Sequence, residues 1–311
     1  MSPISFQGQV AVVTGAGRGL GRAYALGLAA RGAAVVVNDI GIDGSEVSRA
    51  EAVVDEIIAA GGRAVSCRVD VMTPEGGQYL VQEALDTFGS IEVVIHNAGF
   101  LRPGLVEDLT PQDIDDVLGV HLRAAFHVVQ PAWRQMKTNG YGRVVLTSSS
   151  STFGHQANSN YAAAKAGVLG LTTALAGEGA GHGIRVNAVM PYAVSSIAKD
   201  NPLVGDDNPA IRGALDTLTS RRSPESVAPL VLYLASRECV VTGQAFSALA
   251  GRYARAFSGV TNGWISADPE PSLEAIADHM SLIGDTTSFI VPGSMLDEIL
   301  SVSSRVHDLK A

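Results

Sequence analysis

The chain has 311 residues, 46% of them hydrophobic, and a mean hydropathy of +0.21, so it can bury the core of a large domain and is not a disordered protein. Its net charge of −9 and isoelectric point near 5.2 argue against a nucleic-acid partner, which needs a basic surface to replace phosphate counterions. The N-terminus lacks a signal-peptide pattern and no apolar run reaches the ~18 residues of a membrane helix, so we expect a cytoplasmic protein with no membrane partner.

Short β-branched runs alternate with helical stretches along most of the chain. The expected strands are residues 10–14, 33–38, 64–69, 91–95, 143–146, 185–189 and 244–249. The expected helices are residues 20–31, 51–60, 75–88, 113–136, 161–180 and 224–235. Most of the strands carry consecutive apolar residues, which suits strands buried on both faces. The pattern predicts an α/β fold with a doubly wound, mostly parallel seven-stranded sheet and helices on both faces.

The last part of the chain is less regular. Residues 273–280 and 295–302 are the only stretches there that suggest helices. We therefore expect a domain at residues 1–250 followed by a C-terminal extension at residues 251–311. The two cysteines, Cys67 and Cys239, cannot form a disulfide framework, and we expect them to be buried structural thiols.

A glycine-rich segment follows the first expected strand. The segment fits G-x-x-x-G-x-G on Gly15, Gly19 and Gly21, with Leu20 between the last two. Glycines permit a turn that is too tight for a Cβ, and they let backbone N–H groups approach a pyrophosphate. The helix that follows such a turn has an N-terminus that favours anions. After a first strand, this predicts a dinucleotide-binding turn.

The residue that follows the second strand indicates whether NAD or NADP is bound. Asp39 follows that strand, about 20 residues after the glycine turn, where an acid accepts hydrogen bonds from the adenosine ribose and repels a 2′-phosphate. Arg18, beside the glycine turn, is the competing signal because a guanidinium could hold that phosphate. We give the acid more weight and expect NAD, with NADP the alternative.

Tyr161 and Lys165 are spaced i and i+4, so on a helix they share one face. A phenol with an ordinary pKa near ~10 exchanges protons poorly at neutral pH. An ammonium group one turn away favours the phenolate and lowers that pKa, which would make the pair a general acid/base.

Three motifs together resemble the short-chain dehydrogenase/reductase family over residues 6–250. They are the glycine pattern, Asn97-Ala98-Gly99 after the fourth strand, and a Ser-Ser pair before Tyr161-x-x-x-Lys165. Within the family, residues 21–26, 35–41, 120–123 and 227–234 resemble the (3R)-hydroxyacyl-CoA dehydrogenase module of the peroxisomal multifunctional β-oxidation enzyme.

The resemblance implies catalytic roles. Tyr161 would exchange a proton with the substrate oxygen while hydride passes to or from the nicotinamide, Lys165 would lower the tyrosine pKa and bind the nicotinamide ribose, and a serine would hold the substrate oxygen. Counting back from Tyr161 gives Ser148, whereas aligning the preceding strand gives Ser149, which we favour. His121 replaces the usual asparagine of a proton relay that works largely through the main-chain carbonyl and a water.

The resemblance also implies a set of cofactor contacts. They are Gly15, Arg18, Gly19, Leu20, Gly21, Asp39, Asp70, Val71, Asn97, Ala98, Gly99, Tyr161, Lys165 and Pro191. Tyr192 follows Pro191 where the family usually has glycine, which is a departure beside the nicotinamide. The substrate pocket is expected from residues 100–106, 152–158 and 192–222.

The leading hypothesis is an NAD-dependent dehydrogenase of a small molecule, most plausibly a 3-hydroxyacyl-CoA/3-ketoacyl-CoA pair. One alternative is an NADPH-dependent 3-ketoacyl carrier-protein, ketone or steroid reductase, and another is a non-catalytic nucleotide-sensing interaction protein. No histidine pairs with a carboxylate or cysteine at metal-ligand spacing, so we expect no functional metal. Family members associate through the equivalents of helices 113–136 and 161–180, which implies a homodimer or homotetramer.

Overall fold

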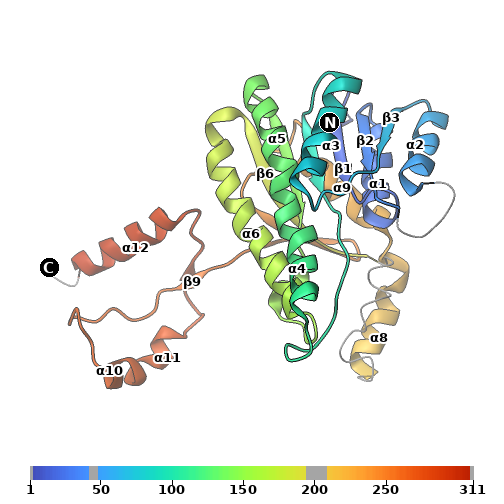
Figure 1. The fold of residues 1–311 in the computed structure, drawn as a ribbon. Coiled ribbons are helices and arrows are strands. Elements are labelled where there is room, and N and C mark those ends of the chain that lie inside the picture. Colours follow the sequence, from blue (N-terminus) through green and yellow to red (C-terminus); the bar gives the residue numbers. More distant parts are fainter. Residues whose placement is uncertain (1–2, 42–47, 194–208, 309–311) are drawn as a thin grey trace. The chain divides into compact units, whose positions relative to one another are not determined.

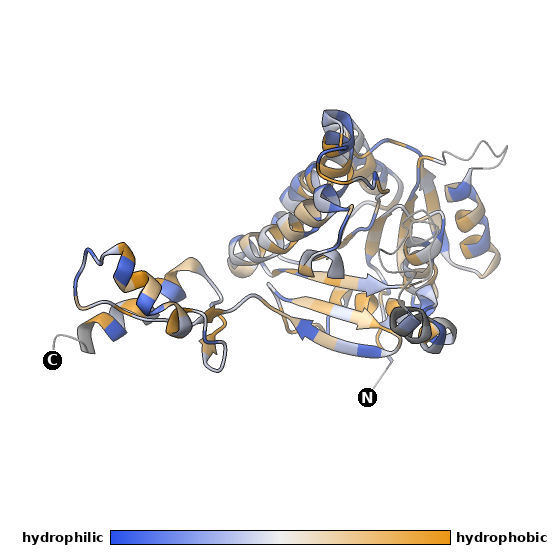
Figure 2. Ribbon diagram, turned by 90° about the horizontal axis from the view of Figure 1, so that it is seen from below, coloured by the Kyte–Doolittle hydropathy of each residue, from blue (hydrophilic) through white to orange (hydrophobic). Residues whose placement is uncertain are grey.

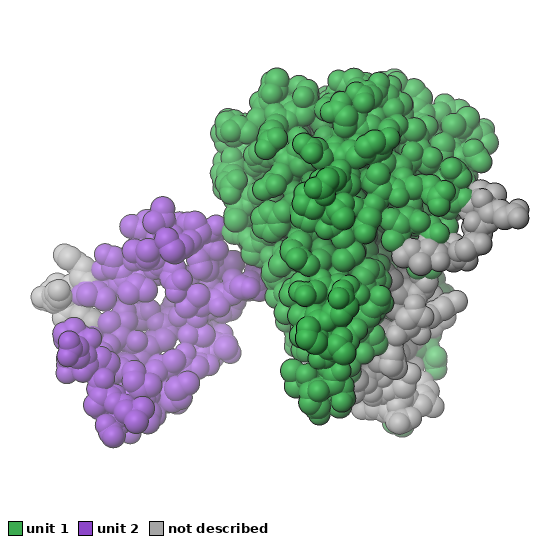
Figure 3. Space-filling view, viewed as in Figure 1, with its two compact units in different colours: residues 1–255 green, residues 256–311 purple. Residues whose placement is uncertain are grey.

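The computed structural model describes residues 3–41, 48–193 and 209–308. The chain divides into two compact units, residues 1–255 and 256–311, which are coloured separately in Figure 3. The larger unit contains the sheet and the helices that surround it, and the smaller one contains three short helices and a two-stranded ribbon.

The larger unit is built on one sheet with the strand order β3-β2-β1-β4-β5-β6-β7-β8. Its strands are β1 (Val10–Thr14), β2 (Ala34–Asn38), β3 (Arg63–Cys67), β4 (Val93–His96), β5 (Gly142–Thr147), β6 (Ile184–Tyr192), β7 (Ala245–Leu249) and β8 (Arg252–Ala256). Strands β1 to β7 are parallel, and the strand order reverses between β1 and β4. The carboxyl ends of β1, β2 and β4 therefore meet at the switch point, where ligands bind in such sheets.

Helices cover both faces of the sheet (Figure 1). One face is covered by α1 (Gly19–Ala29), α2 (Arg49–Ala59) and α9 (Pro224–Ala235), and the other by α3 (Pro74–Phe88), α5 (Ala124–Asn139) and α6 (Ser159–Gly179). The larger unit also contains α4 (Pro111–Leu118), α8 (Pro209–Leu218) and the short helical turns η2 (Ser150–Phe153), η3 (Ala180–His182) and η4 (Thr219–Arg221). The expected doubly wound α/β fold is confirmed.

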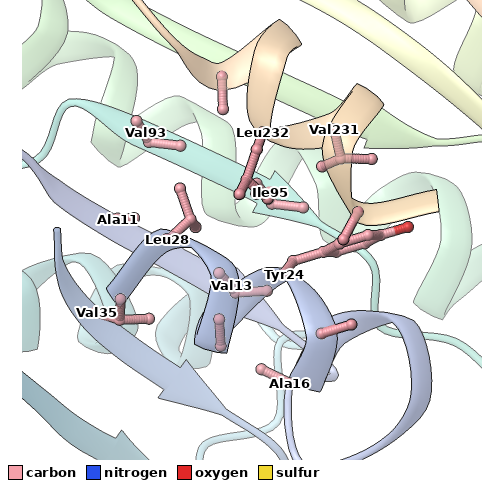
Figure 4. Close-up of a cluster of buried hydrophobic side chains, with 14 of the residues drawn as sticks. Ala11, Val13, Ala16, Tyr24, Leu28, Val35, Val93, Ile95, Val231 and Leu232 are labelled. Carbon is pink, nitrogen blue, oxygen red and sulfur yellow. The ribbon is translucent and has the colours of Figure 1, made fainter. Parts of the chain in front are cut away.

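The inner strands of the sheet contribute to two hydrophobic cores, one on each face. Ala11 and Val13 of β1 pack on the α1 and α9 side, whereas Val10 and Val12 pack on the α3 and α5 side. Figure 4 shows the first of these cores, in which side chains of α1 and α9 meet over the strands, and Figure 2 shows strands of the sheet in the hydrophobic colour. Because both faces are buried, consecutive apolar residues in a strand are the expected pattern.

The sheet has eight strands within the described residues, not the expected seven. Strand β8 follows β7 through a turn at Ala250 (φ 52°) and Gly251 (φ 84°), two consecutive left-handed residues. That conformation makes a two-residue hairpin turn, which returns the chain antiparallel to β7. The strand was missed because Ala-Gly is a weaker turn signal than Asn-Gly, and because two of the five residues of β8 are arginines.

The expected helix at residues 113–136 is wrong in one respect, because it is interrupted. Helix α4 ends at Leu118, a π-helical turn η1 occupies Gly119–Arg123, and α5 follows. Gly119, Val120 and His121 of this turn are all buried. π-Helical turns inside α-helices are frequent at functional sites.

Described by itself, the smaller unit contains β9 (Val260–Thr261) paired antiparallel with β10 (Phe289–Ile290), and helices α10 (Leu273–Asp278), α11 (Met280–Ile283) and α12 (Met295–Asp308). The rings of Trp264 and His279 stack with centroids 3.9 Å apart, and those of Phe257 and Phe289 are 5.8 Å apart. Local aromatic pairs and a short ribbon thus hold this unit together.

Candidate active site

The glycine turn lies between β1 and α1, at the switch point of the sheet. Gly15 has a φ of +62°, which favours glycine, and a Cβ on Gly21 would collide with the carbonyl oxygen of Gly15. The side-chain amide of Asn97, after β4, donates to the carbonyls of Thr14 and Gly15, at 3.2 Å each. The turn is therefore fixed against the loop that follows β4.

A cavity of about 360 Å³ opens at this end of the sheet. Of the predicted cofactor contacts, it is lined by Gly15, Arg18, Gly19, Leu20, Asp39, Asp70, Val71, Asn97, Ala98 and Gly99. Gly21 is buried in α1, and Tyr161, Lys165 and Pro191 are not among the lining residues. Residues from four separate loops thus form one concave surface.

Sequence reasoning missed five lining residues, Asn38, Ile40, Arg49, Met72 and Val120, and a sixth, Phe100, was expected in the substrate pocket instead. Most of these residues are next to predicted positions in the sequence. They could have been predicted by extending the expected contacts along the loops after β2, β3 and β4. Arg49 is different, because it is the first residue of α2 and follows Asp39 by ten positions. Nothing in the local sequence indicated that it would line the cavity.

Thr14 and His96, which were not predicted as functional, connect the two halves of this end of the sheet. Thr14 Oγ1 accepts hydrogen bonds from the backbone N–H groups of Asn97 and Ala98, both at 3.0 Å, and lies 3.2 Å from Nδ1 of His96. His96 Nε2 lies 3.2 Å from the carbonyl oxygen of Val120 in the π-turn.

The direction of these hydrogen bonds follows from the chemistry of each group. A carbonyl can only accept, so Nε2 of His96 carries the proton and Nδ1 accepts from the Thr14 hydroxyl. Burial lowers the pKa of His96 to about 3, so the ring is neutral. The network is fully paired and ties the π-turn, β4 and the glycine turn together.

Tyr161 and Lys165 lie on α6, where Lys165 is buried and Tyr161 is half-buried. The Lys165 ammonium donates to the carbonyl oxygen of Thr147, and its Nζ lies 5.6 Å from the centroid of the Tyr161 ring. Burial lowers the pKa of Lys165 to about 7. The lysine therefore exchanges its proton near neutral pH.

The pKa of Tyr161 differs from the sequence expectation. Burial raises it above the ordinary value, and a hydrogen bond with the Ser149 side chain acts in the opposite direction. Desolvation of the phenol, and not the nearby Lys165, sets the direction of the shift in this structure. Tyr161 is thus a protonated phenol at neutral pH.

The two candidate serines have different surroundings. The Ser148 hydroxyl is buried and donates to the main-chain carbonyl of Lys165 at 2.8 Å. The Ser149 side chain interacts with Tyr161, and its Oγ also accepts from the backbone N–H of Ser151 at 3.1 Å. Ser149 therefore faces the phenol, whereas Ser148 anchors α6 to β5.

His121 projects from the π-turn against Tyr161, with ring centroids 5.0 Å apart in an edge-to-face arrangement. Its Nε2 donates to the carbonyl oxygen of Phe100 at 2.8 Å, so Nδ1 is the unprotonated nitrogen. Burial, followed by the Lys165 charge, lowers its pKa well below 6.5. Nδ1 is buried and has no hydrogen-bond partner among the described residues. A neutral imidazole thus offers a lone pair beside the phenol.

Pro191 lies near the end of β6, paired with Ala248 of β7, and the next residue, Tyr192, places its ring 5.7 Å from the Arg222 guanidinium. Part of the expected substrate pocket, residues 194–208, lies outside the described residues. The other two expected segments meet at one place, where Gly104 N–H donates to Ala157 at 2.9 Å.

No group of three or more histidine, cysteine and acidic side chains is arranged to hold a metal ion among residues 3–41, 48–193 and 209–308. Cys67 and Cys239 are both free and buried. In the same part of the chain, every helix is too short or too polar to cross a lipid bilayer.

Comparison with known proteins matches residues 9–202 to the family model of short chain dehydrogenases. The chain is 38% identical, over 98% of its length, to peroxisomal multifunctional enzyme type 2 of Mus musculus, of which it spans 40%. It is 39% identical to a putative short-chain type dehydrogenase/reductase of Mycobacterium tuberculosis, with 93% of this chain and 99% of that one covered. The solved structure of the full-length type 2 enzyme of Drosophila melanogaster superposes with a TM-score of 0.80 at 31% identity, covering 98% of this chain and 51% of that one.

Proposed function

This chain belongs to the short-chain dehydrogenase family and is an oxidoreductase acting on CH–OH groups, and from that premise we propose that it is an NAD-dependent 3-hydroxyacyl-CoA dehydrogenase. The observation that carries the proposal is the cluster of Ser149, Tyr161 and Lys165 at the same end of the sheet as a cavity that Asp39 lines. Similarity over nearly the whole chain to the type 2 multifunctional enzymes supports the thioester substrate.

The residues of the cavity fit a nicotinamide dinucleotide. Gly19 and Leu20, at the N-terminus of α1, line the cavity, and the first N–H groups of a helix favour an anion such as a pyrophosphate. Gly15, Gly19 and Leu20 would hold the pyrophosphate, Asp39 the adenosine ribose, and Asp70 and Val71 the adenine. Asn97, Ala98, Gly99 and Pro191 would line the riboses and the nicotinamide. When bound, the nicotinamide supplies or accepts the hydride.

Tyr161 would act as the general acid in reduction and the general base in oxidation. Its raised pKa keeps a proton available for a substrate carbonyl oxygen at neutral pH. Ser149 would hold that oxygen with a hydrogen bond, and we prefer it to Ser148, whose hydroxyl is already donated to the Lys165 carbonyl.

Lys165 and His121 would take part in proton transfer to and from Tyr161. A lysine with a pKa of about 7 can release or take up a proton during turnover. His121 remains neutral, so it can only accept a hydrogen bond at Nδ1 while Nε2 donates to Phe100. The relay through the main chain of the π-turn would thus be supplemented by a side-chain acceptor.

The first test follows nicotinamide absorbance during reduction of acetoacetyl-CoA and longer 3-ketoacyl-CoA thioesters, with NADH and NADPH in parallel. Turnover of the thioesters with NADH is the expected result. A strong preference for NADPH would favour the alternative, a 3-ketoacyl carrier-protein or ketone reductase, which Arg18 and Arg49 in the cavity wall would suit. Binding of NADH without turnover of thioesters, ketones or steroids would favour a nucleotide sensor.

The second test replaces Tyr161 by Phe. Loss of a general acid/base costs about 10²–10⁴-fold in kcat, while binding of NADH should be retained. Tyr79→Phe is the matched control, since Tyr79 is 57% exposed on α3 and should keep full activity. A fully active Tyr161→Phe variant would contradict the proposed chemistry.

We further propose that residues 1–250 form the catalytic domain and residues 251–311 an extension to it, and that the protein is a cytoplasmic homodimer or homotetramer. The small residues along α6 would permit close helix packing between copies. Light scattering coupled to size-exclusion chromatography measures the mass, and a monomer at all concentrations would rule the oligomer out.

A further inference from the structure

The carboxylate of Asp39 is held in place by two backbone N–H groups. The N–H of Gly17, within the glycine turn, donates to Oδ2 at 3.1 Å, and the N–H of Gly41 donates to Oδ1 at 3.0 Å. Asp39 follows β2, whereas Gly17 follows β1, so the first of these bonds joins two loops. Hydrogen bonds to a charged acceptor are among the stronger ones in proteins.

Gly17 is required by space and not by backbone conformation. Its φ lies outside the left-handed region, so any residue could adopt it. A Cβ at this position, however, would lie 2.6 Å from Cβ of Arg49 and 2.9 Å from Cγ and Oδ2 of Asp39. Non-bonded carbon atoms prefer about 3.5–4.0 Å, so one neighbour would have to move.

Arg49 is the less able of the two neighbours to move. It is the first residue of α2, and Ser48 before it is the N-cap in a reciprocal capping box with Glu51. Its Cβ is part of that helix, whereas the Asp39 carboxylate lies at the end of a side chain in a loop. A side chain at position 17 would therefore displace the Asp39 carboxylate first.

The charged residues around Asp39 determine what a displacement of its carboxylate would do to cofactor binding. Arg18, Arg49, Asp39 and Asp70 line one cavity, so two arginines and two aspartates surround the space where the adenosine would bind. With the Asp39 carboxylate held inward, the site offers an acceptor to ribose hydroxyls and repels a phosphate. With that carboxylate displaced, this repulsion would weaken, whereas both guanidinium groups would still attract a phosphate.

We propose that Gly17 is a specificity-determining residue, which selects NAD over NADP by leaving room for the Asp39 carboxylate on the glycine turn. The inference rests on the proposed function, since it takes the cavity as the dinucleotide site. Gly17 is a positioning residue that acts through Asp39. Its N–H holds the Asp39 carboxylate, and because it has no side chain it leaves space for that carboxylate.

The test compares Gly17→Ala with the unchanged protein in the binding of NADH and NADPH by titration calorimetry, with thermal melting in parallel. NADH binding should weaken about tenfold, the equivalent of one charge-assisted hydrogen bond, while NADPH binding changes less than about threefold. Gly181→Ala is the control, because Gly181 is an exposed residue of η3 with open space around its Cβ position, and it should leave both affinities unchanged. A Gly17→Ala variant with an unchanged ratio of NADH to NADPH affinity would overturn the inference.

Asp39→Ala separates this inference from the function on which it rests. If Asp39→Ala leaves the cofactor ratio unchanged, the assigned role of Asp39 fails. If Asp39→Ala lowers the preference for NADH but Gly17→Ala does not, only the role of Gly17 fails. If the Gly17→Ala variant does not melt cooperatively, a double variant with Gly17→Ala and Arg49→Gly is used instead. It removes the contact with Cβ of Arg49, which is the closer of the two. That double variant, measured against Arg49→Gly alone, must still show the tenfold loss of NADH binding.

Discussion

Replacing Thr14 by Val tests whether one buried hydroxyl holds the switch point of the sheet together. Valine keeps the branched shape but cannot pair with the N–H groups of Asn97 and Ala98 or with Nδ1 of His96. An unsatisfied buried polar group costs about 1–3 kcal/mol. The amides are only partly buried, so we take the lower end for each of the three groups, a loss of about 3 kcal/mol in unfolding free energy.

Thr14→Ser is the matched control, because it keeps the hydroxyl and loses only a methyl group, at a cost of about 1 kcal/mol. Urea unfolding followed by circular dichroism measures both variants, and an unchanged slope with denaturant would show that the same surface is exposed in each. In thermal melting, about 3 kcal/mol corresponds to a fall of roughly 6–12 °C for a chain of this size. If Thr14→Val were as stable as Thr14→Ser, the network would not be what fixes Asn97 and Ala98 to the glycine turn.

Two further predictions concern the groups near the phenol. Burial lowers the pKa of Lys165 from its ordinary 10.5 to about 7. Between these two pH values the unfolded chain binds a proton that the folded chain does not. The free energy of unfolding should therefore rise with pH, by up to about 1.4 kcal/mol per pH unit. Lys165→Met should remove that part of the slope in unfolding measured from pH 7 to 10, and parallel curves would contradict the assignment. A Cβ on Gly99 would collide with the His121 ring, so Gly99→Ala should cost about 1–3 kcal/mol. In a His121→Ala background the same change should cost at least about 1 kcal/mol less, and a purely additive double variant would argue against this contact.

The strands could be predicted where burial on both faces leaves a continuous apolar run. The bounds of β1 agree with the expected residues 10–14, because all five residues are buried. Strand β6 extends three residues beyond the expected end at residue 189, because the apolar β-branched run stops there while the pairing with β7 continues. In the structure Pro191 still pairs in register with Ala248, since a parallel ladder uses alternate backbone groups and tolerates a missing N–H at one of them.

The π-turn and β8 could not be predicted from periodicity. A single extra residue in a helix leaves the apolar pattern of α4 and α5 nearly unchanged, so residues 113–136 suggested one helix. The hairpin that leads to β8 depends on Ala250 adopting a left-handed conformation, which alanine disfavours and which only the surrounding structure imposes. Both features come from tertiary context.

The candidate site was predictable where its residues lie close together in the sequence. The glycine turn, Asn97-Ala98-Gly99 and the Tyr161 and Lys165 pair are local motifs, and the structure brings them to one end of the sheet. The contacts of Thr14 with His96, and of Gly17 with Arg49, join residues 82 and 32 positions apart and leave no local pattern. The pKa of Tyr161 was mispredicted for a related reason, because spacing reveals the nearby lysine but not the desolvation of both groups.

The two outermost strands of the sheet bear on how copies of this chain behave at high concentration. An outer strand presents unpaired N–H and C=O groups, which another chain can extend into a larger sheet. Here β3 begins at Arg63, and β8 carries Arg252 and Arg255 within five residues. Pairing two copies along β8 would bring arginines against arginines, and both strands are short. The antiparallel β8 thus replaces the more apolar β7 as the outer strand, and it should protect the protein from aggregation by strand addition.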